Sequence, residues 1–407
     1  MERMEWIAPC HFGLESVLKR EIQDLGYEIA QVEDGRVTFY GEADAACRAN
    51  VFLRTAERVL LKAGSFKAVT FDELFEKTKA IPWENYIPKN GKFWVAKASS
   101  VKSKLFSPSD IQSIMKKAMV DRLRSRYHVQ WFQEDGASYP LRVFLMKDIV
   151  TIGIDTSGDS LHKRGYRPSA GKAPISETLA AALIMLTPWR KERILVDPFC
   201  GSGTFPIEAA MMAANIAPGM NRSFTAESWA NLIDKKLWYE AIDEANDLID
   251  DQIETDIQGY DIDGDVVRMA RQNAENAGVD HLIHFQQRDV ADLKHSKKYG
   301  FIITLGNPHI IVDHIMRAIF GELCLRRADP TGTTPSGTQK TGLEPRRLGG
   351  GNFRSRFIPY GNFPIIASGR LQCFSLINYA DRFPGKNLSR IIDITPGSQL
   401  LRTIGHP

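Results

Sequence analysis

The chain has 407 residues, a hydrophobic content of 43% and a formal net charge of only +3. The length allows two or three domains, and the composition is ordinary for a globular protein. No apolar run reaches the roughly 18 residues of a membrane span, and the N-terminus lacks the pattern of a secretory signal. The five scattered cysteines predict neither disulfides nor a metal site, so we expect a reduced, cytoplasmic protein without metal.

The first 65 residues predict a small α+β domain. Apolar residues from Leu14 to Leu25 recur at helical spacing and stop at Gly26, which suits a helix C-terminus. Strand-like segments follow at 28–32 and 36–40, then a helix near 43–49 and a strand at 58–63. Short helices and strands mixed in this way are typical of an α+β unit.

Residues 66–156 predict a second unit of the same kind, with helices at 71–78 and 108–127 and strands at 92–98, 141–146 and 149–155. Basic side chains gather between Lys89 and Arg126, close to Trp94 and Phe106. Cations beside aromatic rings suit a phosphate backbone and stacked bases, although a solvated protein face is the alternative. The predicted RNA contacts here and in the linker below are Lys97, Lys102, Lys104, Lys116, Lys117, Arg164 and Arg167.

The segment 157–175 is rich in glycine, proline and basic residues, so it predicts a linker that faces a polyanion. After this linker, Ser176 can cap a helix over 177–186. From this helix onward the sequence pattern differs from that of the first two units, because short apolar runs alternate with longer helical segments. We expect this part, 176–304, to be one α/β domain.

A ligand crevice is predicted where the apolar run 194–196 leads into Asp197, a Gly201-Ser202-Gly203 turn and a helix. A carboxylate at Asp197 would repel a pyrophosphate, but it suits a ligand that carries an ammonium or sulfonium group. The charge therefore favours S-adenosylmethionine over a nucleotide phosphate. Cys200 fits this turn as a small buried side chain.

Two further acids follow predicted strands. Asp261 ends a strand that begins at residue 257, and a carboxylate there can accept hydrogen bonds from ribose hydroxyls. Asp289 follows the next strand. The segment 213–255, between the glycine turn and Asp261, predicts an inserted helix. We expect Asp197, Asp261 and Asp289 to line the carboxyl edge of a parallel sheet in a doubly wound, Rossmann-like domain.

Several motifs together resemble one family. The segment from Asp197 to Thr204 resembles the cofactor loop of amino-group methyltransferases, residues 12–22 resemble a ferredoxin-like domain, and 101–105 resemble part of a THUMP domain. Over about residues 1–303 the chain resembles THUMP-containing, class I SAM-dependent RNA methyltransferases of the bacterial 23S rRNA guanine-N2 type. The resemblance implies an RNA partner, either rRNA or tRNA, and no membrane. It implies cofactor contacts by Asp197, Phe199, Cys200, Gly201, Ser202, Gly203, Thr204, Asp261, Asp289, Pro174 and Glu177.

The family carries an Asn-Pro-Pro-aromatic motif after the fourth strand of this domain. Here the predicted strand 300–304 is followed by Leu-Gly-Asn307-Pro308-His309-Ile310, so that only Asn307 and Pro308 match. In the family, the Asn side chain and the Pro carbonyl accept hydrogen bonds from the target amine. Because the motif is degraded, an RNA-binding protein with an impaired methyltransferase domain is an alternative, and a DNA adenine-N6 methyltransferase is another.

The composition changes at about residue 304. Residues 304–407 contain 13 glycines and carry a charge of +7, whereas the first 303 residues carry −4. Only 364–368 and 371–378 predict strands, and 331–351 shows neither helical nor strand periodicity. A reading-frame shift near codon 305 would produce such an atypical tail over 305–407, and a divergent end to the sheet is the alternative.

Overall fold

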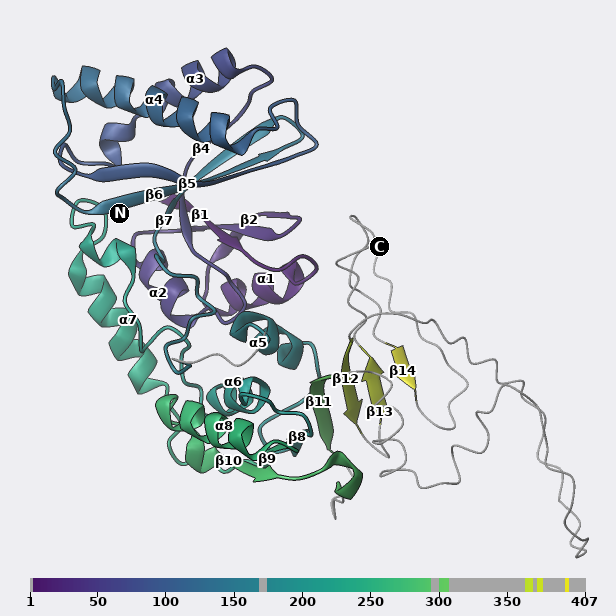
Figure 1. Cartoon of the computed structure of the whole chain (residues 1–407). Coiled ribbons are helices and arrows are strands. Elements are labelled where there is room, and N and C mark those ends of the chain that lie inside the picture. Colours follow the sequence, from purple (N-terminus) through teal and green to yellow (C-terminus); the bar gives the residue numbers. More distant parts are fainter. Residues whose placement is uncertain are drawn as a thin grey trace, which may run out of the picture.

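The computed structural model describes residues 3–167, 174–293 and 300–306, together with the backbone of three short strands within 363–394. The strands form two seven-stranded sheets (Figure 1). One sheet belongs to the N-terminal half of the chain, and the other belongs to the predicted methyltransferase half. No helix within the described residues is long and apolar enough to cross a membrane.

The first sheet runs through both predicted N-terminal domains. Its order is β2-β3-β1-β4-β7-β6-β5. The strands are β1 (Met4–Pro9), β2 (Glu28–Glu33), β3 (Arg36–Gly41), β4 (Leu60–Lys67), β5 (Lys92–Val101), β6 (Ser138–Met146) and β7 (Ile149–Asp155). Since β4 pairs with β1 on one side and β7 on the other, the two α+β units are joined by main-chain hydrogen bonds. The predicted boundary at residue 65 therefore falls inside a strand.

Four helices accompany this sheet. In the first unit, α1 (Glu15–Asp24) packs on β2 and β3, and α2 (Asp44–Phe52) lies below β1 in Figure 1. In the second unit, α3 (Phe71–Ala80) and α4 (Pro108–Tyr127) pack on one another above β5. The ends of α4 match the sequence prediction, because Ser107 caps the helix by accepting a hydrogen bond from the Asp110 N–H and Pro108 suits its first turn.

The second sheet confirms the Rossmann-like prediction. Its order is β10-β9-β8-β11-β12-β13-β14, and the first four strands are parallel. These four are β8 (Leu195–Asp197), β9 (Ile257–Asp261), β10 (Ile283–Gln287) and β11 (Phe301–Gly306). Leu195 packs in one core with α5 (Glu177–Met185), α6 (Thr204–Ala213) and α8 (Gly264–Asn276), whereas Val196 packs in another. Both faces of the sheet are therefore buried, as parallel sheets require.

The predicted inserted helix is α7 (Lys235–Asp247), and it packs on α2 of the N-terminal half. The Arg48 guanidinium donates two hydrogen bonds of 2.7 Å to the Glu244 carboxylate. In the same insertion, the Trp229 ring stacks on Tyr139 of β6 with centroids 4.9 Å apart. The insertion thus fastens the methyltransferase half to the N-terminal sheet.

The last three strands are β12 (Phe363–Ser368), β13 (Gln372–Ser375) and β14 (Ile392–Ile394). The first two agree with the strands predicted at 364–368 and 371–378, and β12 pairs with β11 in the antiparallel sense. The rest of the tail lies outside the described residues. Both accounts of 305–407, the frame shift and the divergent end, therefore remain predictions.

A frame shift makes a prediction about the gene. One of the other two reading frames after codon 305 should encode Asn-Pro-Pro followed by an aromatic residue, because a single inserted or deleted base displaces the original motif without destroying it. Sequencing codons 295–320 from independent clones and translating all three frames measures this. An uninterrupted gene with no such motif in any frame would support the divergent end instead.

Candidate cofactor site

The three predicted acids lie at the same edge of the second sheet. Asp197 and Asp261 are the last residues of β8 and β9, and Asp289 follows the end of β10 by two residues. These strands are parallel neighbours, and their register pairs Asp197 with Gly259 and Asp261 with Gln287. The strand order reverses beside β8, where β11 joins, and α/β folds of this kind bind ligands in the crevice at this point.

The glycine turn after β8 is tied to the end of β9. The Gly201 N–H donates to Asp261 Oδ2 at 3.1 Å, and the Cys200 N–H donates to the Tyr260 carbonyl at 2.8 Å. Gly201 and Gly203 have φ values of +53° and +82°, which side chains rarely allow. A Cβ on Gly203 would lie 3.0 Å from Phe285, whereas one on Gly201 would meet nothing within 4 Å. The backbone at Gly201 is therefore open to a ligand.

Several other residues of this turn are packed or bonded within the protein. Cys200 is buried, and burial raises the pKa of its thiol, so its side chain packs inside the turn, while its contact with the cofactor stays a prediction. Thr204, the first residue of α6, is also buried, and Phe199 packs against the core of the second face. The Ser202 carbonyl accepts a hydrogen bond of 3.0 Å from the Asn273 side chain of α8.

Asp197 is a buried carboxyl group with a strongly perturbed pKa. Only 1% of the residue is exposed. Burial raises its pKa to about 7, and the nearby Asp261 carboxylate adds to the shift, while the neighbouring Thr304 hydroxyl and the hydrogen bond from the Phe199 N–H oppose it. An ionised carboxylate in this position is stabilised by a cationic partner. The site therefore fits the ammonium and sulfonium groups of S-adenosylmethionine.

Glu177, the first residue of α5, is a second buried carboxyl group. Its Oε1 pairs with Arg167 Nη2 at 2.7 Å, but its buried Oε2 has no hydrogen-bond partner within the described residues. Burial raises the pKa of Glu177, although Arg167 opposes the shift. An unpartnered buried oxygen is costly, so it fits a cationic group of a bound ligand. Pro174 and Ile175 precede this residue, and the Ile175 carbonyl accepts a bond of 3.3 Å from Arg167.

Asp289 is the most open of the three acids. Its residue is exposed, and its Oδ1 caps the following turn by accepting a hydrogen bond of 2.9 Å from the Ala291 N–H. The carboxylate stays accessible beside the end of β10. Asn307 and Pro308, the predicted catalytic residues, lie outside the described residues; β11 ends directly before them.

Arg164 and Arg167 were expected to contact RNA, and the structure shows that this expectation is wrong. Arg164 is 3% exposed and donates to the Leu161 carbonyl at 2.8 Å, with its Nε 3.5 Å from Glu208 Oε1. The Arg167 side chain is 9% exposed and pairs with Glu177. Both guanidinium groups compensate buried carboxylates, so neither is available to a polyanion. The segment 157–167 is accordingly packed against the protein and is no open linker.

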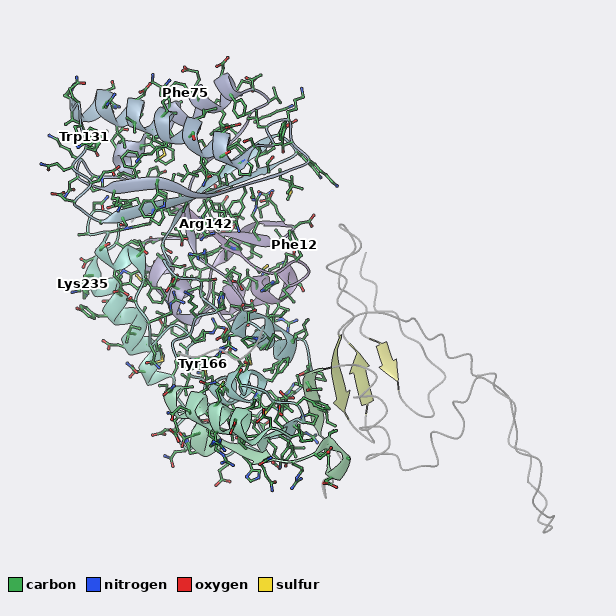
Figure 2. The ribbon with its side chains drawn as sticks, viewed as in Figure 1. Phe12, Phe75, Trp131, Arg142, Tyr166 and Lys235 are labelled. Atoms are coloured by element: carbon green, nitrogen blue, oxygen red, sulfur yellow. The ribbon has the colours of Figure 1, made fainter. Side chains whose placement is uncertain are left out.

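The predicted lysine contacts lie on the N-terminal half. Lys97 is exposed on β5, the edge strand of the first sheet, and Lys102 and Lys104 are exposed in the loop that follows. Lys117 is exposed on α4, whereas Lys116 is half-buried, donates to the Phe93 carbonyl and pairs with Glu134. Exposed aromatic rings accompany them, and Trp131 lies at the outer edge of this half in Figure 2.

Comparisons with known proteins agree with these features. The models of three protein domains match the chain: the RlmL ferredoxin-like domain at residues 5–60, the THUMP domain at 68–155 and the RMKL-like methyltransferase domain at 164–308. YpsC of Bacillus subtilis (strain 168), a protein named as an RNA methyltransferase, is 49% identical over 76% of this chain and 79% of its own length. The chain belongs to the THUMP-containing, SAM-dependent RNA methyltransferases.

Two further relatives support this family. The ribosomal RNA large subunit methyltransferase K/L of Psychromonas ingrahamii is 36% identical over 75% of this chain, which spans 41% of that longer protein. The crystal structure of SMU.472, described as a methyltransferase complexed with SAH, superposes with a TM-score of 0.71 at 41% identity, covering 75% of this chain and 81% of that one. S-adenosylmethionine is therefore the cofactor of this THUMP methyltransferase. Within the described residues, no cluster of side chains could hold a metal ion.

The raised pKa of Asp197 predicts a pH-dependent cost to stability. The pKa of Asp197 is about 7 in the folded protein, above the value of 3.8 for an unfolded chain. The contribution of Asp197 to the free energy of unfolding is therefore fully present below pH 4 and is lost as the pH rises through 7. We expect Asp197→Asn to be more stable than the wild type at pH 8, by up to about 4 kcal/mol at roughly 1.4 kcal/mol per pKa unit. Urea unfolding at pH 4 and pH 8 measures the difference. An unchanged gap between the two proteins at both pH values would contradict the account.

The Arg167–Glu177 pair predicts a recoverable loss of stability. Arg167→Gln leaves the Glu177 carboxylate buried without its partner, so we expect a loss of roughly 3 kcal/mol. Adding Glu177→Gln should restore most of this loss, because the double variant contains no buried charge at this position. Lys97→Gln is the control and should change stability by less than about 0.5 kcal/mol. If the Arg167→Gln protein were as stable as the wild type, Arg167 would not be compensating a buried Glu177 carboxylate.

Proposed function

We propose that this RNA methyltransferase transfers a methyl group from S-adenosylmethionine to the N2 amine of a guanine in 23S rRNA. The observation that carries the proposal is the row of acids at the carboxyl ends of β8, β9 and β10, beside an open Gly201, on a chain whose other half is a THUMP-containing sheet. The K/L relative, named as a large-subunit rRNA enzyme, supports the choice of RNA. Contact with rRNA would place the protein in the cytoplasm.

Each acid has a separate part in holding the cofactor. Asp261 already accepts the Gly201 N–H through Oδ2 and the Asp263 N–H through Oδ1, so the end of β9 is fixed where ribose hydroxyls would donate to the carboxylate. Asp289 would accept the adenine amino group. Asp197 and the free Oε2 of Glu177 would face the positive charges at the methionine end.

The cofactor supplies an electrophilic methyl group, so the chain needs no strong general base. Asn307 and Pro308 would accept hydrogen bonds from the target amine and align its lone pair with the methyl group. Holding the reacting atoms in this way supplies most of the rate enhancement. The amine loses its proton to water after transfer.

The RNA would lie across the exposed side of the N-terminal half. Lys97 on the edge strand, Lys102 and Lys104 in the next loop, and Lys117 on α4 remain accessible there. Trp94 and Phe106 are exposed on the same half and would offer stacking surfaces for unpaired bases. A THUMP-containing half of this kind argues against DNA as the substrate, since that alternative gives the half no role.

Transfer of tritiated methyl groups to 23S rRNA tests the proposed reaction. We expect incorporation by the wild type, a fall of at least about 100-fold for Asn307→Ala because the amine loses its alignment, and wild-type incorporation for the exposed control Glu76→Gln. Digestion of the product should yield N2-methylguanosine. Equal incorporation by Asn307→Ala would remove Asn307 from the mechanism.

The same assay distinguishes the alternative of an impaired enzyme. Calorimetric binding of S-adenosylmethionine without any incorporation would identify an RNA-binding protein whose methyltransferase domain no longer catalyses. Incorporation into duplex DNA in preference to rRNA would identify the DNA adenine methyltransferase.

A further inference from the structure

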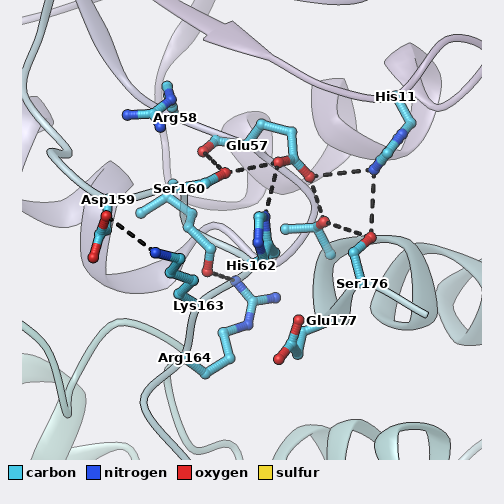
Figure 3. Close-up of polar contacts among 12 residues, drawn as sticks. His11, Glu57, Arg58, Asp159, Ser160, His162, Lys163, Arg164, Ser176 and Glu177 are labelled. Carbon is cyan, nitrogen blue, oxygen red and sulfur yellow. Dashed lines mark hydrogen bonds and ion pairs between the residues drawn. The ribbon is translucent and has the colours of Figure 1, made fainter. Parts of the chain in front are cut away.

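A carboxylate from the N-terminal half reaches the first turn of α5 (Figure 3). Glu57 lies just before β4, and its Oε1 accepts a hydrogen bond from the Thr178 hydroxyl of α5. His11 Nε2 lies 3.3 Å from the same oxygen and 3.5 Å from the Ser176 hydroxyl. Glu57 therefore joins the N-terminal unit to the beginning of a helix that belongs to the methyltransferase domain.

The second oxygen of Glu57 binds the segment between the two halves. Oε2 accepts a hydrogen bond of 2.8 Å from the Ser160 hydroxyl and lies 3.3 Å from His162 Nδ1. Burial favours a higher pKa for Glu57, but the bonds from His11, His162, Thr178 and Ser160 together hold the pKa well below its usual range. The carboxylate is thus ionised and fully used by its neighbours.

The backbone of Glu57 is fixed independently of its side chain. Its N–H donates to the Pro9 carbonyl at 2.8 Å, and its carbonyl accepts from the Leu161 N–H at 2.9 Å. The next residue, Arg58, pairs with the buried Asp155 at 2.7 Å. These bonds fix the main chain at Glu57. A shift of α5 would therefore break its bond to the Glu57 carboxylate, so the carboxylate restrains the position of α5.

From α5 the contacts continue to the glycine turn. Thr178 is adjacent in sequence to Glu177, whose partner Arg167 donates to the Thr204 hydroxyl at 3.0 Å and to the Ile175 carbonyl. Thr204 directly follows Gly203, at the start of α6. The first turn of α5 thus lies between Glu57 on one side and the cofactor turn on the other.

We propose that Glu57 is a positioning residue for the cofactor, and that it holds the first turn of α5 where Glu177 faces the crevice. The inference rests on the proposed role of Glu177 in cofactor binding. It assigns to the N-terminal unit a function besides RNA binding: this unit sets the affinity of the methyltransferase domain for S-adenosylmethionine. A bond that only fastened the two halves together would leave cofactor affinity unchanged.

Calorimetric titration of the full chain with S-adenosylhomocysteine tests the proposal. We expect Glu57→Ala and Thr178→Val each to weaken binding by about tenfold, and Glu57→Gln to recover part of the loss because one oxygen can still accept the Thr178 bond. The double variant Glu57→Ala/Thr178→Val should bind no more weakly than Glu57→Ala, since both changes remove the same bond. Binding of an rRNA fragment should be unchanged in all of them, and Glu76→Gln, an exposed glutamate of α3, should match the wild type throughout.

The outcomes separate this inference from the proposed site. Wild-type affinity for S-adenosylhomocysteine in Glu57→Ala and Thr178→Val, with weakened binding in Glu177→Gln, would overturn the role of Glu57 alone. Wild-type affinity in Glu177→Gln and Asp197→Asn as well would overturn the proposed cofactor site. Equal losses of RNA and cofactor binding in Glu57→Ala would mark a purely structural residue and would also overturn the inference.

Discussion

The cofactor site depends on carboxyl groups that the fold buries at the ends of neighbouring strands. Asp197 ends β8 with almost no contact with water, and Asp261 stands beside it at the end of β9. Burial is the main cause of the raised pKa of Asp197, and the neighbouring Asp261 carboxylate adds to it. The folded chain keeps this unfavourable arrangement because the surrounding strands and the glycine turn fix it. A cationic methyl donor would stabilise the ionised form of Asp197, so we propose that this buried carboxyl group contributes to cofactor binding.

The two halves of the molecule meet through charged and aromatic contacts at separate places. The insertion that carries α7 packs on α2 through Arg48 and Glu244, and its Trp229 stacks on Tyr139 of the first sheet. Closer to the site, Glu57 binds the beginning of α5. These contacts hold the proposed RNA-binding surface in a defined relation to the cofactor crevice.

The sequence predicted the elements that carry strong local signals. The helix 108–127 has a Ser-Pro start and regular periodicity, and the three acids could be placed because each ends or follows a predicted strand. The sequence analysis missed strand β1. Its residues Trp6, Ile7 and Ala8 are all buried, so the strand lacks the alternation of apolar and polar residues that predicts a half-buried strand. The continuity of the first sheet through β4 was missed because pairing is not local. Arg164 and Arg167 were misread because their partners, Glu208 and Glu177, lie on other elements.

The central claim, that an ionised Asp197 meets the positive charge of the cofactor, can be measured directly. Calorimetry of S-adenosylmethionine binding to the wild type and to Asp197→Asn at pH 6 and pH 8 separates this carboxyl group from every other titrating group. With a pKa near 7, ionised Asp197 rises from about a tenth to about nine tenths of the molecules over this range, so the wild type should gain up to about tenfold in affinity relative to the variant. The same pH dependence in both proteins would contradict the account.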